Sequence, residues 1–157
     1  MVKSEFKKIT KEWFFSKGFI KGADKGFGNH FRYTLEKFDV YVMFDKSPYS
    51  EVFEMDIGFH IKSLDWIANN GNVRVEIPNK KYWKHLTMAD GSIRVVKTNF
   101  YYEEWSKEDY LQVLEEVYKI YIQPYFDGGL EHVKNMLIHT HAHEGQVKLL
   151  SMIKQIE

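Results

Sequence analysis

The chain has 157 residues, and its 22 basic and 22 acidic side chains cancel to a formal net charge of zero. This balance argues against a nucleic-acid binder, which needs clustered Lys and Arg, and offers no attraction to an anionic membrane surface. No cysteine is present, which excludes disulfides, thiolate metal sites and cysteine nucleophiles. Neither a secretory signal nor an apolar run approaching the ~20 residues of a membrane span is visible, so we expect a cytoplasmic protein. Aromatic residues make up 17% of the chain, enough to fill the core of a single domain over residues 1–157.

The first predicted element is an amphipathic helix from Ser4 to Lys17. Phe6, Ile9 and Trp13 recur at helical spacing, and Ser4 is placed to cap the amino-terminal end. Gly18 follows as a residue that can end the helix in a left-handed conformation.

Strands with alternating apolar and polar residues follow this helix. In residues 38–45 and 51–62 every second side chain is apolar, which is typical of a sheet with one packed face and one wet face. A shorter alternating run, residues 73–77, ends at Pro78 and predicts a strand at the sheet edge, where proline is tolerated. A turn at residues 89–91 precedes a further strand that begins at Ser92.

Helices return after Trp105. Residues 106–109 resemble a capping box, and an apolar stripe over residues 110–121 predicts a helix that Pro124 ends. Two glycines, Gly128 and Gly129, precede a second helix, and a third lies near the carboxyl terminus. The order of helix, strands and helices predicts an α+β fold, with helices on one face of a mainly antiparallel sheet.

Four pieces of the first 65 residues form a recognisable series: Gly18-Phe19, Phe31-Arg32, Phe44-Asp45-Lys46-Ser47 and the strand from Phe53 to Ile61. In these pieces the chain resembles the bacterial family known as domain of unknown function 4304. Asp45 departs from the family, in which we expect Gln at this position. The resemblance implies an α+β protein of the bacterial cytoplasm and carries no established activity, cofactor or catalytic residue. Some small families of this build look like immunity proteins, which neutralise toxins.

A run of histidines near the carboxyl terminus is the first candidate site. His139, His141 and His143 alternate, and Glu144 follows directly. A catalytic zinc site needs about three protein ligands and an open position, which this run could supply to a metal-dependent hydrolase. The helical zinc motif, however, places its Glu between the two histidines, and Glu144 lies outside them. We therefore prefer a polar connection between helices, in which Thr140 caps the following helix; such a run could also capture stray metal without biological meaning.

The polar face of the sheet is the second candidate. If the strands are neighbours, six ionisable side chains on this face could gather, namely His30, Arg32, Asp39, Glu54, Asp56 and His60. Acid–base chemistry would need two groups whose environments push their pKa values apart. The preferred interpretation is simpler: opposite charges pair across adjacent strands of a wet sheet face.

Aromatic residues outside the periodic stripes form the third candidate. Trp66, Tyr82 and Trp83 lie in two segments predicted to be loops, and Tyr and Trp are over-represented at protein–protein hot spots.

Together these features predict a protein-binding module without catalytic activity or cofactor, whose partner is a protein such as a toxin. A hydrolase using the histidine run, and a small-ligand pocket between sheet and helices, are the alternatives.

Overall fold

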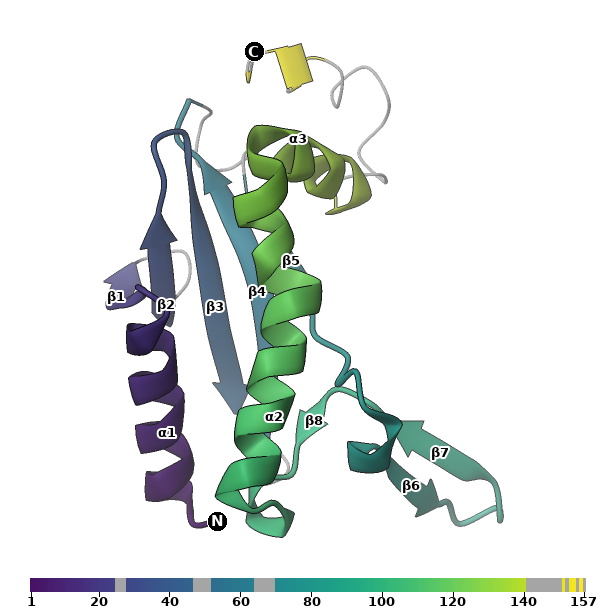
Figure 1. Cartoon of the computed structure of the whole chain (residues 1–157). Coiled ribbons are helices and arrows are strands. Elements are labelled where there is room, and N and C mark those ends of the chain that lie inside the picture. The colour runs from purple at the N-terminus through teal and green to yellow at the C-terminus, as the bar shows by residue number, and fades with distance from the viewer. Residues whose placement is uncertain are drawn as a thin grey trace.

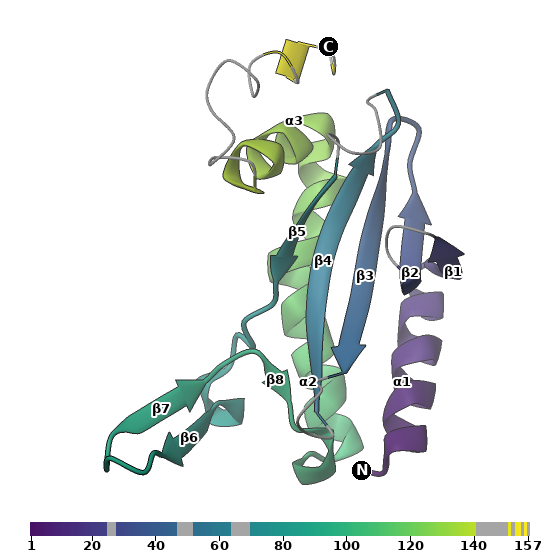
Figure 2. The same ribbon diagram turned by 180° about the vertical axis from the view of Figure 1, so that it is seen from behind.

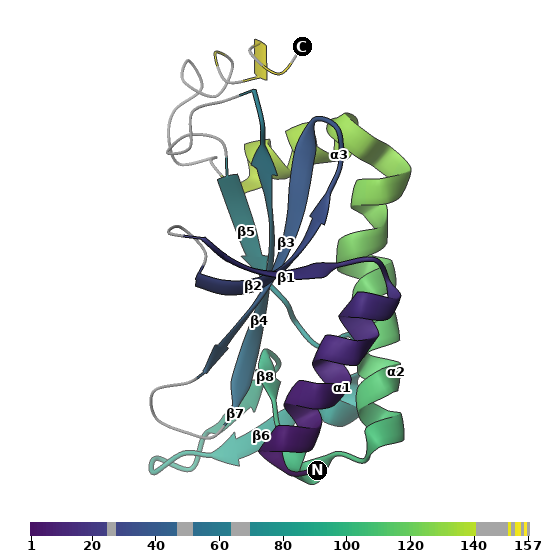
Figure 3. The same cartoon turned by 90° about the vertical axis from the view of Figure 1, so that its left-hand side faces the viewer.

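The computed structural model describes residues 1–24, 28–46, 52–63 and 70–140, together with residues 151, 153, 154 and 156. In these residues the predicted α+β fold is confirmed, with an amino-terminal helix, an antiparallel sheet and carboxyl-terminal helices (Figure 1). The helices lie on one face of the sheet (Figure 3). No helix of the described residues is both long enough and apolar enough to cross a bilayer.

The main sheet contains six strands of the described chain, and every paired strand runs antiparallel to its neighbour. Five strands follow one another in space as they do in sequence: β1 (Ile20–Asp24), β2 (Gly28–Thr34), β3 (Phe38–Lys46), β4 (Phe53–Ile61) and β5 (Asn70–Arg74). The short strand β8 (Asn99–Phe100) pairs with the first residues of β4. The two alternating runs that the sequence predicts as strands are therefore the central strands β3 and β4, and β5 lies beside β4.

The helix α1 (Lys3–Ser16) begins one residue before the predicted cap, with Val2 rather than Ser4 at the N-cap position. Gly18 follows it with a φ of 91°, which confirms the predicted stop. The helix α2 (Lys107–Val117) begins with the predicted capping box: the Ser106 hydroxyl accepts from the amide of Asp109, whose carboxylate accepts from the amide of Ser106.

The prediction that Pro124 ends the helix is wrong. The chain passes from α2 through a π-helical turn, η3 (Tyr118–Ile122), directly into α3 (Gln123–Thr140), and the three form a continuous rod as far as a kink (Figure 1). A proline ring inside a helix clashes with the carbonyl four residues earlier, and the wider π turn before Pro124 relieves that clash. The kink lies at Gly129, whose φ of 55° and ψ of −137° confirm the predicted break.

An aromatic core fills the space between the sheet and the helices. The buried side chains of α1 are Phe6, Ile9, Thr10, Trp13 and Phe14, and those of α2 are Tyr110, Val113, Leu114 and Val117. They meet the apolar faces of β3 and β4, which bury Phe38, Val40, Val42, Phe53, Met55, Ile57, Phe59 and Ile61. The predicted alternation on these two strands thus points the expected side chains into the core.

A buried hydrogen bond joins the two long helices within this core. The Thr10 hydroxyl donates to the Phe6 carbonyl at 2.7 Å, and it lies 2.5 Å from the hydroxyl of Tyr110. Because Thr10 has a single proton, Tyr110 is the donor in the second bond. Burial raises the pKa of the Tyr110 hydroxyl far above its usual value, and the bond with Thr10 acts in the opposite direction. The phenol is therefore protonated at neutral pH and can donate.

Because Tyr110 is the donor, removing either hydroxyl group should lower the stability of the protein by a different amount. Tyr110→Phe should lower the free energy of unfolding by about 1 kcal/mol, because Thr10 keeps its bond to Phe6. Thr10→Val should cost about 2–3 kcal/mol, because it leaves the Tyr110 hydroxyl buried without a partner. Urea unfolding of both variants at pH 7 measures the difference, and a larger loss in Tyr110→Phe would contradict the assignment.

Candidate functional site

The ionisable side chains predicted to gather on the polar face of the sheet separate into two groups at opposite ends of the β3–β4 pair. Asp39 lies opposite His60 at one end, whereas Asp45 lies opposite Glu54 at the other. His30 and Arg32 lie on β2, the neighbouring strand. The six residues therefore do not converge on one point.

The first group is a buried carboxylate between two basic side chains. Asp39 is 7% exposed, and its two oxygens lie 3.9 Å from His60 Nδ1 and 3.8 Å from Lys62 Nζ. Both distances exceed that of a hydrogen bond, so the contacts are electrostatic. Lys62 also donates to the carbonyl of Leu35 at 2.5 Å, which holds the ammonium group at the strand end.

The second group places three carboxylates around one arginine. Arg74 of β5 lies directly opposite Asp56 in the strand register and donates to both of its oxygens, at 2.5 and 3.0 Å. The same guanidinium forms an ion pair with Glu54 and lies 3.5 Å from an oxygen of Asp45. Arg74 was not singled out from the sequence, because its place beside these carboxylates depends on the pairing of β4 with β5.

The ionisation of Asp56 is shifted within this group. Burial, and then the nearby Asp45, raise the pKa of Asp56 to about 6 from its ordinary 3.8, while a hydrogen bond with Asn72 lowers it. The fork from Arg74 also favours the charged form, since a guanidinium stabilises a carboxylate. The net effect places the titration of Asp56 closer to neutrality than that of an ordinary carboxyl group.

The polar face is drier than simple alternation predicts. His30, Tyr41 and Asp56 are all buried on this face. The His30 ring packs edge-on against Tyr41, with ring centroids 4.8 Å apart, and a side chain at Gly22 would lie within 2.7 Å of its Nε2 atom. The large side chains of His30 and Tyr41 therefore cover part of this face, and His30 does so by lying over Gly22. The cross-strand pairs of opposite charge, Asp39 with His60 and Asp56 with Arg74, agree with the preferred interpretation. The expectation of a wet face, however, is wrong for the buried His30, Tyr41 and Asp56.

The predicted histidine site lies mostly outside the described residues. His139 is exposed in the last turn of α3, and the hydroxyl of Thr140 donates to the Met136 carbonyl at 2.9 Å. His141, His143 and Glu144 are not among the described residues. Within the described part of the chain, no group of three or more His, Cys, Asp and Glu residues could hold a metal ion. A metal site at the histidine run stays a prediction.

The predicted aromatic residues Tyr82 and Trp83 lie together beside α2, and Trp66 is not among the described residues. Tyr82 is 7% exposed and donates from its hydroxyl to Asp109 at 2.8 Å. The indole of Trp83 donates to the Ile77 carbonyl at 2.6 Å and remains partly exposed. With Tyr101 and Trp105, both side chains line a pocket of about 230 Å³, so they contribute to an accessible surface as well as to structure.

A two-stranded hairpin projects from the body next to this pocket (Figures 1 and 2). We call it the β arm; its strands are β6 (Lys84–Thr87) and β7 (Ile93–Val96). The predicted turn at residues 89–91 forms its tip, where Asp90 accepts from the amide and hydroxyl of Ser92 at 2.9 and 2.6 Å. The strand predicted from Ser92 corresponds to β7, whereas β6, whose residues lack a clear alternation, was not predicted.

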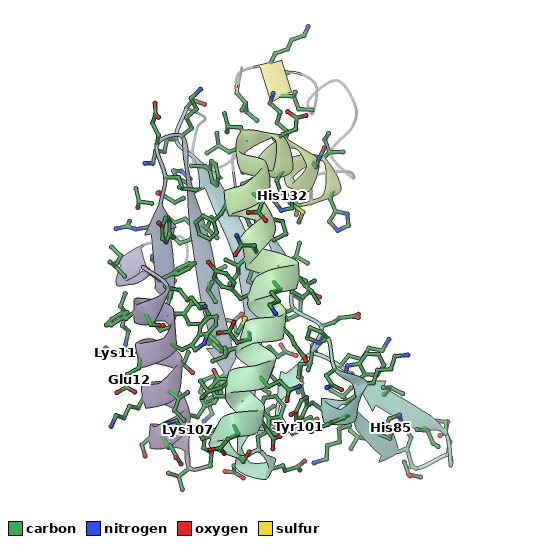
Figure 4. All side chains as sticks on the ribbon, viewed as in Figure 1. Lys11, Glu12, His85, Tyr101, Lys107 and His132 are labelled. Carbon is green, nitrogen blue, oxygen red and sulfur yellow. The ribbon has the colours of Figure 1, made fainter. Side chains whose placement is uncertain are left out.

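The β arm exposes apolar side chains on both of its faces. Ile93 is 67% exposed, and Leu86, Met88 and Val95 are each at least 36% exposed. The register places Ile93 and Val95 on one face with His85, and Leu86 on the other with Arg94. Figure 4 shows His85 on the arm and Tyr101 at its base. Exposed apolar residues gathered on one projecting element make the β arm a candidate interaction surface.

Comparisons with known proteins found no matching family model, curated protein or solved structure. The resemblance of the first 65 residues to the domain of unknown function 4304 therefore stays a prediction.

Proposed function

We propose that this chain is a non-catalytic protein-binding module that holds its partner through the β arm. The observation that carries the proposal is the exposure of Leu86, Met88, Ile93 and Val95 on one projecting hairpin. Covering these side chains with a partner removes apolar surface from water, which is a main driving force of protein association. Two-stranded ribbons also have open edges, which a strand of a partner can pair with.

The base of the arm supports this role because it holds the hairpin in a fixed position. The ring of Tyr82 packs against Trp105, with centroids 5.3 Å apart, while its hydroxyl is bonded to Asp109 of α2. Lys84 forms an ion pair with Glu104, and its ammonium lies 4.4 Å from the centre of the Tyr101 ring. A preorganised surface loses less conformational entropy on binding than a mobile one, so these contacts favour affinity.

The charge of this region indicates the chemistry of the partner. Residues 80–97 contain five Lys and Arg and one acidic residue, Asp90. Lys81 lies 3.7 Å from Asp109, and Lys84 pairs with Glu104, but no described carboxylate forms an ion pair with Lys80, Arg94 or Lys97. A partner surface that combines apolar and acidic side chains complements this arrangement. A bacterial toxin neutralised by this chain is the most specific version of the proposal, and it rests on the resemblance found in the sequence.

Photo-crosslinking followed by affinity measurement tests the proposal. A photoreactive amino acid at position 93 should capture one acidic protein in the source cells, whereas the same residue at position 120 should not. The purified partner should then lose at least about 30-fold in affinity for Ile93→Asp, the size of a hot-spot change. Ile120→Asp is the matched control, because Ile120 is 55% exposed on η3 and does not belong to the β arm, and it should change affinity less than two-fold, as expected of a surface site without partner contact.

Two results would contradict the proposal. Equal crosslinking or equal loss of affinity at positions 93 and 120 would show that the arm is not the contact surface. Capture of a nucleic acid instead of a protein at position 93 would assign the basic arm to a different class of partner. The product of the neighbouring gene is the first protein to test, since toxin-neutralising proteins are expected beside their toxins.

A further inference from the structure

A groove between α1 and the sheet lies apart from the β arm. It has a volume of about 560 Å³, within the roughly 300–1,000 Å³ typical of ligand pockets. Its apolar lining is Phe6, Phe31, Val42, Phe44 and Phe53, which come from α1 and from strands β2, β3 and β4. Phe44 is only partly buried, so its ring is the most open part of the lining. The other four apolar residues are at most 9% exposed, so the aromatic surface that water reaches in the groove is mainly the Phe44 ring.

Among the described residues that line this groove, lysines supply the charge. Lys7, Lys8 and Lys11 come from the outer side of α1, Lys21 from β1 and Lys46 from the last residue of β3. All five are exposed, and among the described residues that line the groove none is acidic. Lys11 projects from α1 away from α2 (Figure 4), and its ammonium lies 5.5 Å from the Phe15 ring. Glu12 reaches only Lys8, at 3.9 Å.

This concentration of positive charge contrasts with the net charge of the whole chain, which is zero. Five ammonium groups around an apolar floor repel one another, and an anion placed among them lowers that repulsion. An anionic head with an apolar tail satisfies both parts of the groove, because the tail removes aromatic surface from water. The lining has no arginine, whose planar fork would suit a phosphate, so recognition rests on point charges.

We propose that this groove binds a single-chain amphipathic anion, specifically a long-chain fatty acid. The carboxylate lies among Lys7, Lys11 and Lys21, and the acyl chain lies over Phe44 toward Phe6 and Phe53. Thr10 stays bonded to Phe6 and Tyr110 in this arrangement, so binding does not require the core hydrogen bond to break.

Fluorescence titration with a dansyl-labelled undecanoic acid tests this inference. The full-length protein should saturate at one site, and palmitate should displace the probe, whereas hexadecanol, which lacks the charge, should not. Lys7→Glu/Lys11→Glu should weaken probe binding at least about ten-fold, because it replaces two attractions by two repulsions. Lys107→Glu/Lys119→Glu is the matched control: it changes the charge equally on exposed lysines that do not line the groove, and it should weaken binding less than about two-fold.

Several outcomes would overturn the inference. The first is that the probe does not bind saturably, and the second is that hexadecanol displaces it as effectively as palmitate. The third is that both double variants lose the same amount of probe affinity. Co-sedimentation with phosphatidylglycerol vesicles without palmitate binding would assign the lysines to a membrane surface instead. Circular dichroism and urea unfolding of both double variants show whether they are folded, so that a loss of binding can be distinguished from a loss of folding. Ile93→Asp should bind the probe as the native chain does, so the groove and the β arm are tested separately.

Discussion

Phe6→Ala should lower the free energy of unfolding by about 3–5 kcal/mol, the cost of removing a buried phenylalanine ring and leaving a cavity. Phe6 is 2% exposed and lies at the centre of the aromatic core. Its ring stacks on Phe53 and Tyr102, with centroids 5.2 and 4.7 Å apart, and lies 4.8 Å from the Tyr110 ring. It therefore joins α1 to the sheet and to α2.

The same substitution at Phe15 is the matched control. Phe15 belongs to the same helix but is 43% exposed, and its edge-on contact with Phe31, at 6.3 Å, is longer than those of Phe6. We expect Phe15→Ala to cost less than about 1 kcal/mol, as most exposed positions do. Thermal unfolding should show a fall of about 10 °C for Phe6→Ala and a few degrees at most for Phe15→Ala, given the usual conversion for a chain of this size. Similar falls in the two variants would show that Phe6 is not the centre of the core.

The periodic parts of the fold could be predicted from the sequence because local geometry determines them. In β3 and β4 the alternation reports directly which side chains face the helices, and the Ser106–Asp109 capping box needs only a three-residue spacing. The route of the chain through Pro124 could not be predicted in this way. A π turn has no strong residue preference of its own, and it forms where packing on both sides favours a continuous helix.

Features that depend on strand pairing also could not be predicted from the sequence. The strand predicted from Ser92 exists as β7, but the sequence did not indicate its partner: β7 pairs with β6, outside the main sheet, and leaves Ile93 in water. Apolar residues favour burial, but they do not specify which surface buries them. In the proposed function that surface belongs to a partner.

Arg74 and the three carboxylates around it, which come from β3, β4 and β5, lead to a further prediction. The effect of mutating Arg74 should change with pH. Between its ordinary pKa of 3.8 in the unfolded chain and about 6 in the folded protein, Asp56 holds a proton in the folded state more often than in the unfolded state. Stability therefore falls as the pH rises through this interval. At higher pH, Arg74 is the cation within ion-pair distance of all three carboxylates, Asp45, Glu54 and Asp56.

Arg74→Met should consequently be more harmful in alkaline than in acidic solution. At pH 8 three charged carboxylates lose their shared cation, and we expect a loss of about 2–4 kcal/mol, toward the lower end because the Arg74 side chain is 39% exposed. At pH 5 protonation of Asp56 relieves part of the repulsion, and the loss should fall to about half of that value. Urea unfolding at the two pH values measures both numbers.

Two further variants separate charge from packing at this position. Arg74→Lys keeps the charge and loses the two-point contact, so it should cost about 1 kcal/mol with little dependence on pH. In an Asp56→Asn background, which removes the titrating group, the loss caused by Arg74→Met should be nearly the same at pH 5 and pH 8. If Arg74→Met alone destabilised the protein equally at both pH values, its effect would come from lost packing of the arginine stem, and the carboxylates would not be coupled through it.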